Sequence, residues 1–127
     1  MVTAKKEERR EQLLDSSQLA RQVVDIVEER KGTDIVLIDL RGFSPFTDYF
    51  VIATAENERQ LRALLRAVEE RLSEAGVEPH HIEGTPESGW ILIDYVDVIV
   101  HLFGPEEREF YRLESVWANA PVVLRIQ

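Results

Sequence analysis

Cysteine is absent from this chain of 127 residues, which excludes disulfide frameworks, thiolate zinc sites and cysteine nucleophiles. Glycine and proline are scarce, at 6 and 5 residues, so collagen-like and low-complexity chains are excluded too. No apolar run approaches the roughly 20 residues of a membrane-spanning helix. The chain begins with neither the apolar core of a signal peptide nor the acid-poor pattern of a transit peptide. These absences predict a soluble, cytoplasmic protein with no membrane partner.

Basic residues are also in short supply, with 15 Lys and Arg against 24 Asp and Glu and a formal net charge of −9. A protein that binds nucleic acid through its phosphates needs a basic stripe, and this net charge repels phosphates. We therefore expect little direct nucleic-acid contact. The acidity favours a basic protein partner, although solubility alone is the commoner reason for such a net charge. The composition is otherwise globular, with 44% hydrophobic and 31% charged residues in a length typical of one domain.

The hydrophobic periodicity predicts an α+β fold, because several strands follow one another without an intervening helix and exclude a purely parallel sheet. The expected domain, residues 16–127, has a mixed sheet with parallel and antiparallel pairs, and residues 1–15 form a charged tail or helix extension. The first expected elements are a helix from Ser16 or Ser17 to a left-handed cap at Gly32, strands 34–40 and 48–54, and a helix from Asn57 to Gly76. They are followed by a short strand 81–83 and a strand pair 90–95 and 97–103. The last are a helix from Gly104, with Phe110, Leu113 and Trp117 along one face, and an edge strand 122–124.

Candidate catalytic groups are few. His101, one of the adjacent histidines 80 and 81, and Glu83 have a spacing that does not forbid zinc, but surface or hydrogen-bonded histidines are the simpler interpretation. Asp94 and Asp97 flank the hairpin turn, where they hold Mg²⁺ or cap the turn. No glycine-rich phosphate loop accompanies them, so turn capping is favoured. We expect a non-enzyme, without catalytic residues, metal or cofactor.

The strand over residues 97–103 carries the clearer signal. Its even positions are uniformly apolar, whereas its odd positions hold Asp97, Ile99, His101 and Phe103. That second face is too mixed for an ordinary core and too apolar for solvent. Trp90, Tyr95 and Tyr111 are near in sequence, and such side chains are typical anchors of protein–protein interfaces. The alternative is that Trp90 and Ile99 simply pack under a helix.

Three blocks of sequence resemble the ribosomal silencing factor family, also called Iojap-like, in order from about residue 17 to 120. They are residues 48–54 followed by Arg59-Gln60, then Glu83-Gly84, Gly89-Trp90 and residues 94–103, then residues 105–108 with Tyr111, Leu113-Glu114 and Trp117. The chain departs from the family pattern at Ala55, Asn57, Gly104 and Val96. Val96 stands where the family has glycine in the hairpin turn, and valine disfavours a positive φ.

The resemblance implies a nucleotidyltransferase-like topology without its catalytic motifs. It also implies a translational repressor that binds the large ribosomal subunit through ribosomal protein fourteen, a basic protein, and sterically blocks joining of the small subunit. A homodimeric interaction module and, less simply, a metal-dependent nucleotidyltransferase are the alternatives, and a homodimer is also expected to form off the ribosome. The expected partner-binding residues, carried over by position, are Trp90, Asp94, Tyr95, Asp97, His101, Arg108 and Tyr111.

Overall fold

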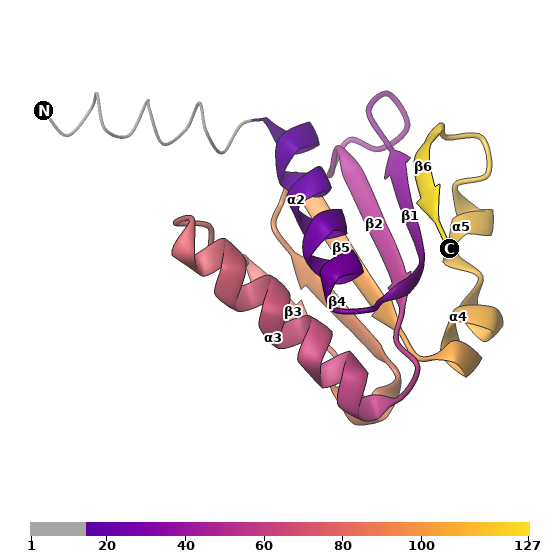
Figure 1. Ribbon diagram of the computed structural model, residues 1–127. Helices are drawn as coiled ribbons and strands as arrows, with labels where there is room; N and C mark the ends of the chain where they lie inside the picture. The colour runs from indigo at the N-terminus through magenta and orange to yellow at the C-terminus, as the bar shows by residue number, and fades with distance from the viewer. Residues whose placement is uncertain (1–14) are drawn as a thin grey trace, which may run out of the picture.

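A six-stranded mixed sheet runs through the computed structural model, which describes residues 15–127 (Figure 1). The strand order is β3-β4-β5-β2-β1-β6. Only β2 and β5 pair in parallel, and every other neighbouring pair is antiparallel, which confirms the predicted α+β class. The strands are β1 (Thr33–Asp39), β2 (Tyr49–Thr54), β3 (His81–Glu83), β4 (Trp90–Asp94), β5 (Val98–Phe103) and β6 (Val122–Ile126).

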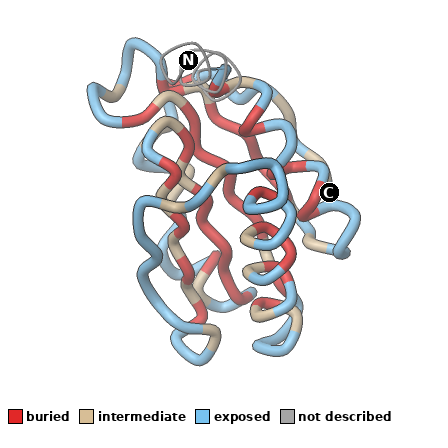
Figure 2. Tube along the Cα trace, turned by 90° about the vertical axis from the view of Figure 1, so that its left-hand side faces the viewer, coloured by how far each residue is buried: buried red, intermediate tan, exposed pale blue. Residues whose placement is uncertain are grey.

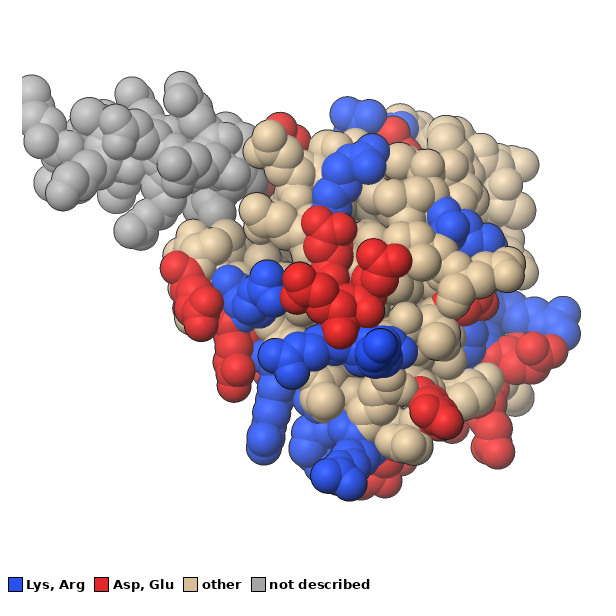
Figure 3. Space-filling view, viewed as in Figure 1, with Lys and Arg blue, Asp and Glu red and all other residues tan. Residues whose placement is uncertain are grey.

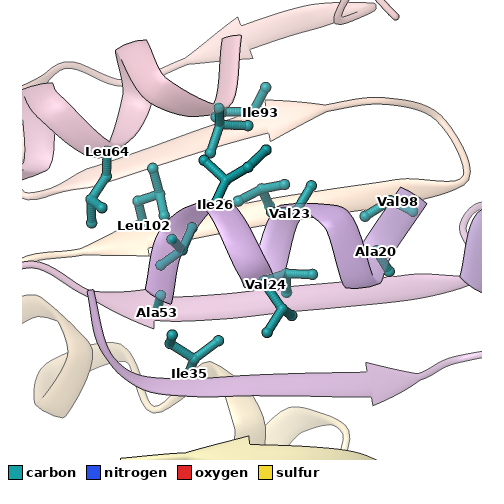
Figure 4. Packing of buried hydrophobic residues seen from close by; sticks show 14 of the residues in the cluster. Ala20, Val23, Val24, Ile26, Ile35, Ala53, Leu64, Ile93, Val98 and Leu102 are labelled. Carbon is teal, nitrogen blue, oxygen red and sulfur yellow. The ribbon is translucent and has the colours of Figure 1, made fainter. Parts of the chain in front are cut away.

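Two amphipathic helices, α2 (Ser16–Glu29) and α3 (Glu58–Glu74), cover one face of the sheet (Figures 1 and 4). Both begin with a side-chain cap. The Asp15 carboxylate accepts from the Gln18 backbone N–H at 3.1 Å, and the Asn57 side chain accepts from the Gln60 N–H at 2.9 Å. The helices start where the sequence predicts. The predicted tail falls largely on residues 1–14, which lie outside the described residues.

The predicted left-handed cap at Gly32 is wrong by one residue. Lys31 takes the positive φ, at 69°, and its backbone N–H donates to the Glu28 carbonyl. Gly32 is required for a different reason, because a Cβ there would overlap the Cγ1 atom of Val27. Glycine therefore lets the chain turn tightly against α2 before it enters β1.

Two short helices lie on the other face, α4 (Pro105–Tyr111) and α5 (Leu113–Val116). The sequence predicted a single helix there, but Arg112 adopts a φ of 44° and interrupts it. Phe110 is consequently 79% exposed, whereas Trp117 packs edge-on against Phe50 at a ring-centre distance of 5.8 Å. The prediction that Phe110, Leu113 and Trp117 lie along one face of a single helix is therefore wrong.

Most residues of the central strands are buried (Figure 2), whereas β3 lies at an exposed edge of the sheet. All three residues of β3 are exposed, and so are most residues of the segment that carries the 3₁₀ turn η1 (Pro86–Ser88) between β3 and β4. The predicted edge strand is β6, which pairs with β1 at the opposite end of the sheet. Within residues 15–127, no helix is both long enough and apolar enough to span a bilayer.

Candidate protein-binding surface

Strand register brings a group of side chains together on the sheet face opposite α2 and α3. Trp90 lies beside Phe103, Leu92 beside His101 and Asp94 beside Ile99 across the β4–β5 pair. Alternation along β4 turns Ile91 and Ile93 to the helix side, where both are fully buried. On the far side of β4, residues 81 and 83 pair with residues 94 and 92. We call Trp90, Leu92, Asp94 and Glu83, with Tyr111 above them, the β4 surface.

Aromatic rings form the centre of the β4 surface. The Trp90 ring centre lies 5.0 Å from that of Phe103 and 4.5 Å from that of Tyr111. Trp90 is half-buried, whereas Tyr111 is 47% exposed. A hollow of about 280 Å³ opens between these rings and the loop after β3, lined by Glu83, Gly84, Ser88, Trp90, Leu92 and Tyr111. An apolar floor with polar groups at its edge suits the binding of a protein side chain.

His101 lies beneath this surface and orients Trp90. The indole Nε1 donates to His101 Nδ1 at 3.2 Å, and the edge of Phe50 packs on the imidazole at a ring-centre distance of 4.6 Å. Burial lowers the pKa of His101 to about 4, so the ring is neutral and its Nδ1 is free to accept. His101 is only 3% exposed, so the prediction that it binds a partner directly is wrong.

The two acids of the predicted site occupy different places. The Asp94 carboxylate accepts from the Val96 backbone N–H at 2.7 Å and lies 3.4 Å from His81 Nδ1, so it caps the hairpin turn at the rim of the β4 surface. Asp97 is partly buried just before β5, and desolvation together with Asp48 raises the pKa of its carboxyl. No group of three or more metal-ligating side chains gathers within residues 15–127.

Two predicted partner-binding residues lie in the interior instead. Tyr95 is 7% exposed in the helix-side core, where burial raises the pKa of its phenol. Arg108, also 7% exposed, pairs with Glu114 at 3.1 Å and donates to Thr54 Oγ1 at 2.8 Å. The Arg108 guanidinium therefore links α4 and α5 to the sheet. The assignment of both residues to a binding surface is corrected.

Leu92 is a surface residue that the sequence argument missed. It lies between Trp90 and Asp94 on β4, and period-two alternation alone places it on their face. The family model described as ribosomal silencing factor during starvation matches residues 13–127.

The chain belongs to the ribosomal silencing factor family. The ribosomal silencing factor of Halalkalibacterium halodurans is 33% identical over 110 residues, which cover 87% of this chain and 94% of that protein. A crystal structure from Chromobacterium violaceum has a TM-score of 0.79 and 31% identity, and the match covers 82% of this chain and 87% of that one. The family acts in ribosome-associated translational silencing.

The name of a more distant relative is also informative. The Mus musculus protein named for mitochondrial assembly of the ribosomal large subunit is 30% identical over 98 residues. The match covers 75% of this chain and 43% of the mouse protein. The silencing-factor domain thus also occurs within a longer protein.

Proposed function

We propose that this protein represses translation by binding the large ribosomal subunit through its ribosomal protein fourteen and sterically blocking docking of the small subunit. Family membership supports the ribosome as the target, and the name of the mouse relative points to the large subunit. The observation that carries the proposal is the β4 surface, a half-open aromatic surface that the fold itself leaves uncovered.

The make-up of the β4 surface supports a protein partner. Trp90 and Tyr111 provide large, rigid contact area at low conformational cost, and the His101 hydrogen bond fixes the Trp90 ring before binding. A fixed anchor loses less entropy when it is buried by a partner. The rim carboxylates of Glu83 and Asp94, within a chain of net charge −9, complement a basic protein. Such complementarity speeds encounter and fixes orientation more than it sets affinity.

Steric occlusion requires no chemical step, and we propose that the protein acts without catalysis. A nucleotidyltransferase would use Asp94 and Asp97 as metal ligands, but Asp94 already accepts a hydrogen bond from the Val96 backbone N–H of its own turn. The second oxygen of Asp94 faces His81 at the start of β3. Both contacts support a role in shaping the hairpin rather than in holding a metal ion.

The test uses co-sedimentation with purified large subunits, followed by a subunit-joining assay. The variant Tyr111→Lys removes an exposed ring and places a cation where we propose a basic partner. Loss of an interface anchor typically costs 2 kcal/mol or more, so affinity should fall about 30-fold. The matched control is Phe46→Lys, because Phe46 is 84% exposed in the loop between β1 and β2, outside the β4 surface.

Binding and joining must fail together if the mechanism is steric. Wild-type protein that binds large subunits without reducing subunit joining would refute the mechanism. Tyr111→Lys protein that binds like Phe46→Lys would refute the β4 surface as the docking site. A homodimer that sediments with unchanged size when large subunits are added would favour the self-association alternative instead.

A further inference from the structure

Four arginines surround a second hollow on the helix-covered side of the molecule. Arg30 follows α2, and Arg59, Arg62 and Arg66 project from the first half of α3. The hollow has a volume of about 530 Å³. Figure 3 shows Lys and Arg side chains gathered toward the lower edge of this face, where α3 begins, with Asp and Glu side chains above and beside them. We call this group the arginine hollow.

Most of the positive charge in the arginine hollow is not neutralised by neighbours. Arg62 pairs with Glu58 at 3.6 Å and with Glu87 at 2.9 Å. No ion pair formed within residues 15–127 involves the other three arginines, all of which are exposed. Glu70 is the acid that lines the hollow. The site therefore keeps a local excess of cations although the whole chain carries −9.

Local charge decides what such a hollow attracts. The Debye length at physiological ionic strength is about 8 Å, so a phosphate inside the hollow is screened from acids on the opposite face of the protein. Guanidinium groups bind phosphate oxygens through paired, planar hydrogen bonds. Three arginines spaced three and four residues apart on one helix present those groups along a line, which fits a chain of phosphates.

The arginine hollow also adjoins the β4 surface around one edge of the sheet. The loop that joins β3 to β4 connects them, because its Glu87 pairs with Arg62 while its Ser88 lines the aromatic hollow. A protein docked through the β4 surface would hold the arginines against whatever flanks its partner. On a large ribosomal subunit the surface between proteins is RNA, whose phosphates have the required charge.

We propose that the arginine hollow binds backbone phosphates of ribosomal RNA beside the docked protein partner. The inference rests on the proposed function, since it requires the protein to sit on the large subunit. It refines the expectation of little nucleic-acid contact, which was drawn from the net charge of the chain. An acidic protein segment or the acidic half of α3 in a second copy are competing occupants, and the experiment separates them.

The first measurement is the salt dependence of binding to purified large subunits. The double variant Arg59→Gln with Arg66→Gln removes two unpaired cations without adding charge. The logarithmic slope of affinity against salt should become shallower by about two, so between about 50 and 200 mM salt the wild type loses about tenfold more affinity than the variant. The control is Arg21→Gln, because Arg21 is an exposed arginine of α2 that does not line the hollow.

The second measurement identifies the occupant. A photoreactive side chain replaces Ala63, which is exposed in the hollow between the arginines, in the full chain bound to large subunits. Cross-links to RNA that ribonuclease removes are expected. Cross-links to a protein or to a second copy, or no RNA cross-link at all, overturn the proposal. A double variant with the wild-type salt slope also overturns it, whereas a wild type that does not bind large subunits refutes the proposed function itself.

Discussion

The two faces of the sheet differ in how completely the chain covers them. On the helix side, α2 and α3 seal every inward residue of the central strands, including Val51, Val100 and Leu102, which are fully buried. On the other side, α4 and α5 pack over β1, β2 and β5 and reach β4 through Tyr111, and the β4 residues Trp90 and Leu92 stay half-exposed. The helix side therefore provides most of the stability of the fold, and the open side is the one that we propose to bind a partner.

The largest expected effect separates the two faces by stability. Leu64 of α3 is fully buried against the sheet, so Leu64→Ala should lower the free energy of unfolding by about 3 kcal/mol. The matched change on the other face is Leu92→Ala, which removes the same atoms from a half-exposed site and should cost less than about 1 kcal/mol. Urea denaturation followed by circular dichroism measures both values.

In binding to large subunits, the order of the two variants should be reversed, with Leu92→Ala having the larger effect. Refolded Leu64→Ala protein is expected to bind large subunits normally at a temperature where it remains folded, because Leu64 does not contribute to the β4 surface. Leu92→Ala removes part of the floor of the aromatic hollow and should weaken binding. Equal destabilisation by the two changes would mean that the faces are not divided between stability and function as proposed.

The next effect concerns the boundary between the core and the β4 surface, at His101. Its pKa of about 4 in the fold lies below the value of about 6.5 in an unfolded chain. As pH falls, the imidazole therefore binds a proton in the unfolded state before it does so in the folded state. The contribution of the neutral His101 ring to the free energy of unfolding is complete above about pH 6.5 and is lost toward pH 4. The loss between pH 7 and pH 5 should be about 2 kcal/mol, from the linkage between the two pKa values.

An exposed histidine, His80, supplies the comparison. His101→Gln removes the buried ring, so its unfolding free energy should fall by about 2 kcal/mol less than that of the wild type over the same pH range. His80→Gln changes an exposed histidine beside β3 and should leave the wild-type pH profile intact. Parallel profiles for wild type and His101→Gln would show that the imidazole is not held neutral beneath Trp90.

Much of the architecture is predictable from local patterns. Period-two alternation in β5 separates Val98, Val100 and Leu102 from Ile99 and Phe103, and the structure buries the two sets in different clusters. The caps of α2 and α3 are also predictable, because the side chain of each cap residue accepts a hydrogen bond from the backbone N–H three residues later. The same alternation, applied to β4, would have placed Tyr95 inside and Leu92 outside.

The remaining features depend on contacts that are distant in the sequence. Arg108 resembles an exposed helix residue until Asp34 and Thr54 are brought to it by the folding of β1 and β2. The arginine hollow likewise needs the end of α2 beside the start of α3, an approach fixed in part by Gln60, whose side-chain amide donates to the Lys31 carbonyl at 2.7 Å. Along the helix alone, its alternating charges indicate only a solvated face.

The smallest expected effect lies in the hairpin turn between β4 and β5. Val96 adopts a φ of 71°, a left-handed conformation that costs a residue with a Cβ about 1–2 kcal/mol. The residue is 53% exposed, so replacing its side chain removes little packing. Val96→Gly should raise the free energy of unfolding by about 1 kcal/mol, because relief of the backbone strain exceeds the entropy that glycine adds to the unfolded chain.

A similarly exposed valine gives the opposite sign if this reasoning is correct. Val122 is 52% exposed in strand β6, and Val122→Gly should lower the free energy of unfolding by about 0.5–1 kcal/mol. The turn cap is a backbone N–H of residue 96 bonded to Asp94, so Val96→Gly keeps it and should bind large subunits as the wild type does. If both changes destabilise the protein, the Val96 side chain must contribute packing to the open face of the sheet. The hairpin turn would then belong to the part of the molecule that stabilises the fold.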